Sequence, residues 1–263
     1  MKTILDTIIE HKRMEVLKRK GRKPLHVLVE KPNYKRTPLK PAHFFKEAEP
    51  GIIAEFKRKS PSKGVISDAS DPVPIVTAYK NGGAVAASVL TDRDFFGGSF
   101  KDLENVRNSV GEFPLLRKDF IIDPYQIHEA KAYGADIILL IASVLTKDQI
   151  KELVKLSSSH GLSVLLEVHA EEELDKWIPG ITMIGVNNRD LRNFSVDIQR
   201  SINLFKKLPD EALKISESGL GLPADIRMLF DIGYQGFLIG ERFMKEADPG
   251  QELSNFINDI KVN

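Results

Sequence analysis

The chain has 263 residues, of which 42% are hydrophobic, so it can bury a full core, and we expect one domain over residues 1–263. It contains no cysteine, which excludes disulfides, thiolate metal sites and cysteine nucleophiles and suits the cytoplasm. The 38 Lys and Arg residues nearly balance the 37 Asp and Glu residues, so the net charge of +1 argues against nonspecific nucleic-acid binding. No apolar run reaches the roughly 18 residues that cross a bilayer, so no membrane association is expected.

An amphipathic helix is predicted between Lys2 and Arg22, where apolar residues recur at helical spacing. These residues are Ile4, Leu5, Ile8, Ile9, Val16 and Leu17. A proline-interrupted stretch from Pro24 to Pro50 follows, so the first 50 or so residues form a helical extension ahead of the first strand. Two roles are compatible with this helix: it could only cover the core, or it could also line a binding site.

Eight short apolar runs alternate with helix-length segments from Gly51 onward, which is the pattern of parallel βαβ units. The predicted strands are Ile52–Phe56, Val85–Leu90, Leu115–Arg117, Ile137–Ile141, Ser163–Glu167, Met183–Val186, Leu213–Ser216 and Gly236–Ile239. The predicted helices include Pro74–Asn81, Tyr125–Tyr133, Lys147–His160, Glu171–Trp177, Val196–Phe205 and Pro223–Phe230. No Gly-x-Gly-x-x-Gly follows the first strand and the spacing is nearly even, so we predict an α/β fold of the (βα)8 TIM-barrel type rather than an open sheet.

Polar residues gather where the predicted strands end, and the carboxyl ends of barrel strands form the active-site face. These positions hold Glu55, Lys57, Lys118, Glu167, Asn187, Arg189 and Glu217. Glu55 and Lys57 are two residues apart, so both should point into the barrel, while Ala54 and Phe56 face the helices. The set could be a neutralised structural cluster, since buried charges are normally paired. However, five strands place acidic, basic and amide side chains at the same end of the barrel, and this arrangement favours proton-transfer chemistry over a purely structural cluster.

Glycine turns follow the last two predicted strands, at Ser218-Gly219 and at Gly240-Glu241. Each glycine alone could be an ordinary turn residue. Together, after the last two strands of a barrel, the turns place backbone N–H groups where a phosphate commonly binds.

Two further loops follow predicted strands. The basic loop from Lys57 to Gly64 could be merely solvated, but its position favours a lid over an anionic substrate. The loop from Thr91 to Ser99 has the composition of a mobile flap. Its aromatic residues, Phe95 and Phe96, either form an apolar tip or pack on each other.

Other common kinds of active site lack support in the sequence. The six histidines show no ligand spacing such as His-Glu-x-x-His, so no metal is expected. No Gly-x-Ser-x-Gly or Walker loop occurs, which argues against acyl-enzyme chemistry and nucleotide hydrolysis.

Residues 53–62, Ile-Ala-Glu-Phe-Lys-Arg-Lys-Ser-Pro-Ser, closely resemble the signature of indole-3-glycerol-phosphate synthases. The segments 116–120, 166–169, 185–191, 216–219 and 237–241 also resemble blocks of that family, in the same order. The helix from Ile4 to Lys20 is similar to its N-terminal helix, so the resemblance covers nearly the whole chain.

The resemblance implies conversion of 1-(2-carboxyphenylamino)-1-deoxyribulose 5-phosphate to indole-3-glycerol phosphate, with loss of carbon dioxide and water. The electron-rich anilino ring can attack its own sugar carbonyl once an acid protonates that oxygen, so no cofactor is implied. Lys118 is our choice for this acid and Glu167 for the base, while Lys57 either places the substrate carboxylate or acts as acid in dehydration. Residues implied to orient these groups and the sugar are Glu55, Asn187, Glu217 and Arg189.

The resemblance also implies two binding regions. The phosphate would be held by Ser60, Ser218, Gly219, Gly240 and the backbone at Glu241. The aromatic ring would lie in an apolar slot of Phe96, Phe120, Leu139 and Ile141. Some relatives carry Ser at the position of Glu241, and since a carboxylate cannot cheaply face a phosphate, we expect its side chain to turn away.

Two alternatives compete with this interpretation. A phosphoribosylanthranilate isomerase would be another phosphosugar barrel, but it usually needs a cysteine, which is absent. A catalytically silent, anion-binding barrel is disfavoured by the presence of Lys57, Lys118 and Glu167. We expect a monomer that binds a small phosphosugar.

Overall fold

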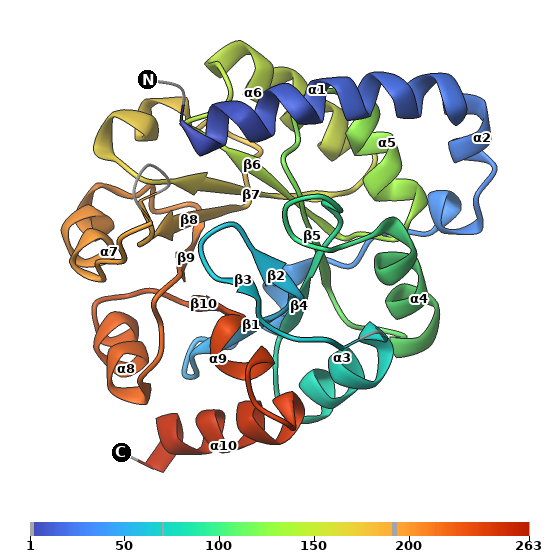
Figure 1. The fold of residues 1–263 in the computed structure, drawn as a ribbon. Helices are drawn as coiled ribbons and strands as arrows, with labels where there is room; N and C mark the ends of the chain where they lie inside the picture. Colours follow the sequence, from blue (N-terminus) through green and yellow to red (C-terminus); the bar gives the residue numbers. More distant parts are fainter. Residues whose placement is uncertain (1–2, 70, 191–193, 263) are drawn as a thin grey trace.

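Eight parallel strands close into a barrel in the computed structural model, which describes residues 3–69, 71–190 and 194–262 (Figure 1). Around the barrel the strands follow the order β1-β10-β9-β8-β7-β6-β5-β4. Their bounds are β1 (Gly51–Phe56), β4 (Ala86–Leu90), β5 (Leu115–Lys118), β6 (Ile137–Ile141), β7 (Ser163–Val168), β8 (Met183–Asn187), β9 (Leu213–Glu217) and β10 (Gly236–Ile239). The (βα)8 prediction is confirmed, and the bounds differ from the predicted ones by at most one residue at either end.

Helices surround this barrel as an outer layer (Figure 1). They are α3 (Pro72–Asn81), α4 (Phe100–Val110), α5 (Tyr125–Ala132), α6 (Lys147–Ser159), α7 (Gln199–Leu204), α8 (Pro223–Asp231), the short α9 (Glu241–Met244) and α10 (Pro249–Val262). Two short 3-10 helices are η3 (Glu171–Lys176) and η4 (Phe205–Lys207). The segment predicted as a helix at Glu171–Trp177 is therefore a 3-10 helix. α4 is an addition to the predicted helices, and Ser99 caps it by accepting the backbone N–H of Asp102.

The predicted helix Val196–Phe205 begins too early. Val196 instead forms an isolated antiparallel bridge with Arg189, and the backbone N–H of Asp197 donates to the Asn188 carbonyl. This pairing after β8 holds the chain extended, so α7 begins only at Gln199.

The N-terminal extension consists of α1 (Ile4–Arg22), α2 (Leu25–Val29), η1 (Pro32–Lys35) and η2 (Pro41–Phe44). A capping box between Thr3 and Asp6 starts α1, while Lys2 lies outside the described residues. Figure 1 shows α1 running beside α5, and Arg19 of α1 pairs with Glu129 of α5. The expected packing face is only partly correct, because Leu17 is 63% exposed.

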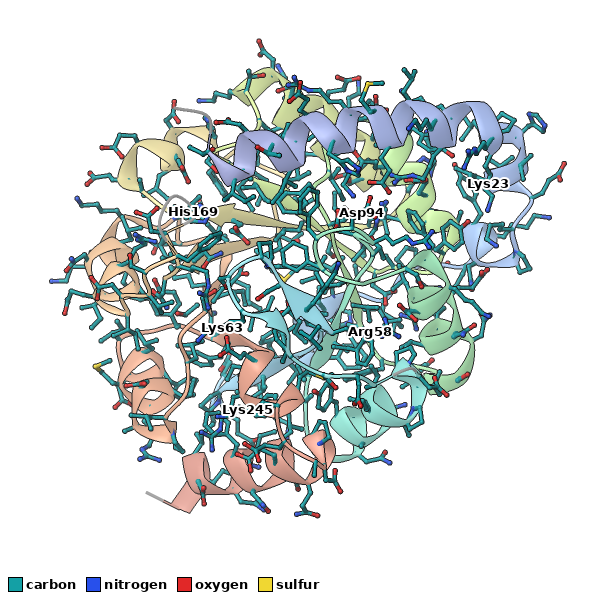
Figure 2. The ribbon with its side chains drawn as sticks, viewed as in Figure 1. Lys23, Arg58, Lys63, Asp94, His169 and Lys245 are labelled. Carbon is teal, nitrogen blue, oxygen red and sulfur yellow. The ribbon has the colours of Figure 1, made fainter. Side chains whose placement is uncertain are left out.

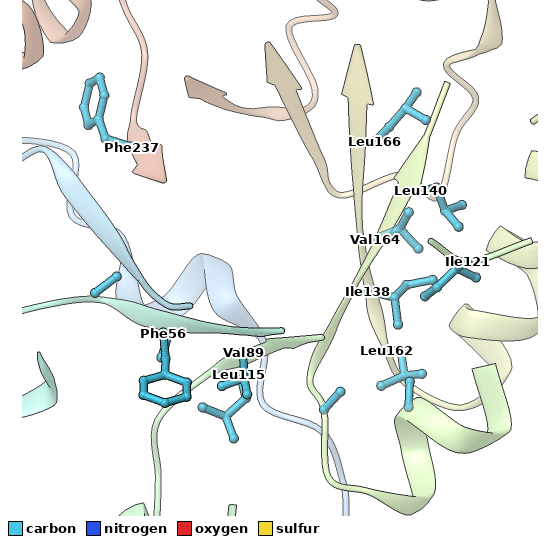
Figure 3. Packing of buried hydrophobic residues seen from close by; sticks show 14 of the residues in the cluster. Phe56, Val89, Leu115, Ile121, Ile138, Leu140, Leu162, Val164, Leu166 and Phe237 are labelled. Atoms are coloured by element: carbon cyan, nitrogen blue, oxygen red, sulfur yellow. The ribbon is translucent and has the colours of Figure 1, made fainter. Parts of the chain in front are cut away.

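The apolar core has two layers, separated by the strands. The outer layer lies between strands and helices, and Figure 3 shows part of it, with Phe56, Val89 and Leu115 from three different strands. The inner layer fills the barrel with side chains that include Ile53 and Leu165. Strand alternation thus sends Phe56 outward and the neighbouring Glu55 inward, as predicted.

The basic loop after β1 forms an antiparallel hairpin of β2 (Lys59–Ser60) and β3 (Gly64–Val65), which lies across the mouth in Figure 1. Arg58 anchors the hairpin to α4 by a forked ion pair with Asp102, at 2.7 and 3.1 Å. Figure 2 shows Arg58 on the side of α3 and α4, away from Lys63. Arg58 thus contacts α4, whereas Lys63 lines the mouth.

Within the described residues, no helix is both long enough and apolar enough to cross a membrane.

Candidate active site

A cavity of about 590 Å³ opens at the carboxyl ends of the strands. Every residue predicted to act in catalysis or binding lines it. These are Glu55, Lys57, Ser60, Phe96, Lys118, Phe120, Leu139, Ile141, Glu167, Asn187, Arg189, Glu217, Ser218, Gly219, Gly240 and Glu241. The structure therefore brings the predicted site residues together, although it does not assign their roles. Leu191, the last residue of the 185–191 segment, lies outside the described residues.

Lys118, the last residue of β5, stands between two carboxylates. Its Nζ lies 2.6 Å from Glu217 Oε2 and 3.1 Å from Glu167 Oε2. Burial alone would lower the pKa of Lys118, but the charges of Glu217, Glu167 and Glu55 outweigh it and raise that pKa. The side chain is consequently an ammonium group over the whole physiological pH range.

The two carboxylates beside Lys118 differ in their affinity for protons. Burial raises the pKa of Glu217 to about 7, because Lys118 only partly compensates and the charge of Glu167 opposes a second ionised carboxylate. For Glu167, burial is outweighed by Lys118 and His169, so its pKa is lowered. At neutral pH Glu167 is therefore ionised while Glu217 is partly protonated, and such a separation is typical of acid–base pairs.

Gly185 provides the space for the carboxylate of Glu217. It lies on β8, between Glu167 of β7 and Ile215 of β9 in the strand register. A Cβ added at Gly185 would meet Glu217 Oε1 at a distance that real Cβ atoms do not adopt. Glu217 Oε1 is buried and has no hydrogen-bond partner among the described residues, so the packing around it fixes its position.

Glu55 and Lys57 form a second ion pair at the end of β1, with Lys57 Nζ 2.7 Å from Glu55 Oε1. Ser88 of β4 donates a hydrogen bond of 3.3 Å to Glu55 Oε2. Burial would raise the pKa of Glu55, but the charges of Lys57 and Lys118 outweigh it and lower that pKa. Both members of this pair are thus charged and face the cavity.

The two glycine turns meet at one side of the cavity. Ser218 and Gly219 both have left-handed backbones, with φ of 68° and 75°. Glu241 departs from the expectation for its side chain, because the carboxylate stays at the mouth, 3.7 Å from Lys63 Nζ and 3.8 Å from Arg189 Nη2. These two cations compensate its charge, which explains how a carboxylate is tolerated there.

The opposite part of the lining is apolar. The rings of Phe96 and Phe120 lie 5.9 Å apart between centroids. Phe95 does not pair with Phe96 but packs edge-on against His11 of α1, with centroids 5.5 Å apart. The two aromatic residues of the flap therefore do not pack on each other, and Phe96 forms the apolar tip that lines the cavity.

Sequence reasoning missed three lining residues from the extension, Ile4, Leu5 and Ile8. Their spacing marks one face of a helix, but only the packing of α1 on the barrel shows that this face reaches the cavity. The question left open for the helix is thus settled, since α1 also walls the site.

Two charged residues were also missed. His169 follows β7, and its Nε2 lies 3.3 Å from Glu167 Oε1. Its position two residues after Glu167 was an available signal, because residues two apart in a strand share a face. Lys12 of α1 is fully buried, with Nζ 2.7 Å from Asp92 Oδ2 and 2.9 Å from Asp119 Oδ1. Nothing in its helical spacing distinguishes Lys12 from a surface lysine.

Among the described residues, no group of three or more His, Asp or Glu side chains is arranged to hold a metal ion. Charged groups of the mouth form ion pairs with one another, Lys57 with Glu55 and Lys118 with Glu167 and Glu217.

Comparisons with known proteins agree with this geometry. Solved structures of similar fold include 3-hexulose-6-phosphate synthase from Salmonella typhimurium, with a TM-score of 0.63 and 12% identity over 80% of this chain and 99% of that one. Another is the tryptophan synthase α2β2 complex of Pyrococcus furiosus, with a TM-score of 0.62 and 14% identity over 82% of this chain and 99% of that one. At such low identity these structures support the barrel fold alone.

Closer relatives share the sequence as well. The indole-3-glycerol phosphate synthase of Bacteroides thetaiotaomicron is 45% identical over 99% of this chain and all of its own length. That of Salinibacter ruber is 46% identical over 96% of this chain and 94% of its own. A family model described as indole-3-glycerol phosphate synthase matches residues 5–256, and the chain therefore belongs to the indole-3-glycerol phosphate synthase family.

Proposed function

We propose that the chain performs the reaction of its family with Lys118 as the acid and Glu167 as the base. The reaction closes the indole ring of 1-(2-carboxyphenylamino)-1-deoxyribulose 5-phosphate and releases carbon dioxide and water. The observation that carries the assignment is the position of Lys118 Nζ, 2.6 Å from Glu217 and 3.1 Å from Glu167 inside the cavity. An ammonium group beside two carboxylates of different pKa supplies both a proton donor and a proton acceptor.

In ring closure, the ring carbon that bears the carboxylate attacks the sugar carbonyl carbon. The carbonyl π electrons move to oxygen, which takes a proton from Lys118. The raised pKa of Lys118 does not prevent this transfer, since an alkoxide is a stronger base than an amine. Glu217 lies within hydrogen-bond distance of Lys118 and, with a pKa of about 7, can return a proton to it.

Carbon dioxide then leaves, and the electrons of the broken bond restore the aromatic ring. In the last stage the hydroxyl group takes a proton and departs as water, while Glu167 removes the proton from carbon that completes the indole. Lys57 either places the substrate carboxylate or protonates this hydroxyl, and its contact with Glu55 is compatible with both roles. Over the whole reaction one proton is taken up, which matches the conversion of a carboxylate to neutral carbon dioxide.

We assign binding roles to the remaining lining residues. Ser60, Ser218, Gly219, Gly240 and the backbone of Glu241 would hold the phosphate, with Arg189 beside them. Phe96, Phe120, Leu139 and Ile141 would receive the aromatic ring. Support comes from the division of the cavity lining into a polar side with two glycine turns and an apolar side.

The test is turnover of that substrate by the purified chain, followed by indole fluorescence. Lys118→Met and Glu167→Gln should each lower kcat at least about 100-fold, the usual contribution of a general acid or base. Lys35→Met, which changes an exposed lysine of η1, serves as the control and should retain activity. An inactive native chain would refute the function, whereas full activity of Lys118→Met would refute only the assignment of the acid.

We further propose a cytoplasmic monomer that needs neither nucleic acid nor cofactor. The net charge of +1 and the lack of cysteine support this proposal. Light scattering coupled to size-exclusion chromatography should give the mass of a single chain, and a dimer mass would contradict the proposed state.

A further inference from the structure

His169 occupies a position that the reaction scheme above leaves unused. It follows the last residue of β7, and Figure 2 shows it at the carboxyl end of that strand. Its side chain is only 12% exposed. The imidazole lies between two carboxylates, with Nε2 3.3 Å from Glu167 Oε1 and Nδ1 3.7 Å from Glu173 Oε2.

Glu173 of η3 fixes this arrangement. Its Oε2 accepts the backbone N–H of His169 at 2.7 Å and also faces the ring. One carboxylate therefore orients both the main chain and the side chain of His169. The 3-10 helix, which the sequence pattern did not distinguish from an ordinary helix, serves to bring Glu173 back to the strand end.

The carboxylates on both sides of the ring favour a positive charge on it, although neither ring nitrogen has hydrogen-bond geometry to a partner among the described residues. A neutral imidazole has one N–H group and one lone pair, so one of its nitrogens would present a lone pair to a carboxylate. A doubly protonated ring instead places its positive charge beside both carboxylates. Burial would lower the pKa of His169, but the contact with Glu173 and the charges of Glu167, Glu173 and Glu217 outweigh burial and raise it.

Glu167 thus contacts two cations, one at each oxygen. Lys118 lies at Oε2 and His169 at Oε1. In the proposed ring closure Lys118 gives its proton away and becomes neutral. Until Glu217 returns a proton to Lys118, Glu167 would be a buried carboxylate without its main partner, and such a group takes up a proton and ceases to be a base. A second cation that stays charged prevents this.

We propose that His169 is a positioning residue, held by Glu173, whose positive charge keeps the Glu167 carboxylate ionised and in place while Lys118 transfers its proton. This inference rests on the proposed function, because it assumes that Glu167 is the base. His169 acts through Glu167 and does not itself exchange a proton with substrate.

The direct test uses His169→Gln, which preserves an N–H donor but removes the charge. On the acidic limb of the kcat–pH profile we expect kcat to fall about tenfold with KM changed less than about twofold, because there the charge sets the fraction of Glu167 that is ionised and does not act on substrate binding. Loss of the cation raises the pKa of Glu167, so the acidic limb of the kcat–pH profile should move up by about one pH unit. His169→Lys restores a cation and should return the limb toward its native position.

Glu173→Gln should shift the acidic limb in the same direction by a smaller amount. Combined with His169→Gln it should add no further shift, because Glu173 acts through the ring. His26→Gln changes an exposed histidine of α2 and should leave the profile unaltered. Circular dichroism melting of each variant separates loss of fold from loss of charge.

One measurement is independent of activity. In the native chain, nuclear magnetic resonance of the His169 ring should show both nitrogens protonated at pH 7. A neutral ring at pH 7, or a His169→Gln variant with native kcat and an unmoved acidic limb, overturns the inference. If His169→Gln lowers kcat and the melting temperature but leaves the acidic limb in place, His169 has only a structural role, and this result also overturns the inference. If the native chain does not turn over the substrate, the proposed function fails, while the ring measurement still decides the charge.

Discussion

Gly185→Ala tests whether the position of the Glu217 carboxylate controls the acid, Lys118. The added methyl group would point into the barrel and lie 3.1 Å from Leu165 Cδ1. It would come closer than 3.0 Å to Glu217 Oε1, a distance that real Cβ atoms essentially never show. Because the side chain of Glu217 is only 1% exposed, its carboxylate cannot turn into solvent.

The size of the effect follows from this crowding. The carboxylate must withdraw by the better part of an ångström, which stretches its 2.6 Å contact with Lys118 Nζ. Misplacement of a catalytic group by about 1 Å costs about 100-fold in rate, so we expect kcat to fall by that factor. Crowding of a packed interior typically costs about 1–3 kcal/mol, so the free energy of unfolding should fall within that range.

Indole fluorescence gives kcat, and urea unfolding gives the free energy. Adding Glu217→Ser to Gly185→Ala removes the crowding, so stability should recover while activity does not. Gly21→Ala, where the new Cβ has nothing within 4 Å, is the matched control and should leave kcat unchanged. A Gly185→Ala enzyme with kcat within about threefold of native would refute the link between this glycine and the acid.

Lys12→Met should lower the free energy of unfolding by about 3–5 kcal/mol, because it leaves Asp92 and Asp119 buried without their shared cation. Burial would raise the pKa of Asp119, but Lys12 and Arg117 outweigh it and lower that pKa, so the deficit in urea unfolding should shrink as the pH falls and Asp119 becomes protonated in the variant. A loss below about 1 kcal/mol at pH 8 would contradict the reasoning. Glu217→Gln removes a negative charge 2.6 Å from Lys118 Nζ, so the pKa of Lys118 should fall. The alkaline limb of the kcat/KM–pH profile should therefore move to lower pH, and a limb that stays in place or moves upward would speak against Lys118 as the acid.

The positions of the strands and of the site could be predicted because both depend on local patterns. Apolar runs mark buried strands wherever they occur, and the two-residue period of a strand sends Glu55 inward and Phe56 outward without reference to the rest of the chain. Since parallel strands present their carboxyl ends to one face, polar residues at those ends had to meet at the mouth. The residues predicted at these ends therefore line one cavity.

The misassigned segments are those whose structure depends on distant partners. Val196 is extended because it pairs with Arg189 across a loop, which its local helical pattern does not reveal. Leu17, which was expected on the packing face of α1, is exposed, while Lys12 of the same helix is buried against Asp92 and Asp119. A buried charge is acceptable only where partners from elsewhere compensate it, so periodicity alone cannot identify it.

The sequence by itself determined which residues of the strands and strand ends face the cavity, because strand alternation and strand ends are properties of neighbouring residues. Tertiary structure alone decided which charges pair. Lys118 meets Glu167 and Glu217, which lie 49 and 99 positions further along the chain, and His169 adds a second cation to the same carboxylate. Proton affinities depend on burial and on charges within a few ångströms, and closure of the barrel sets both.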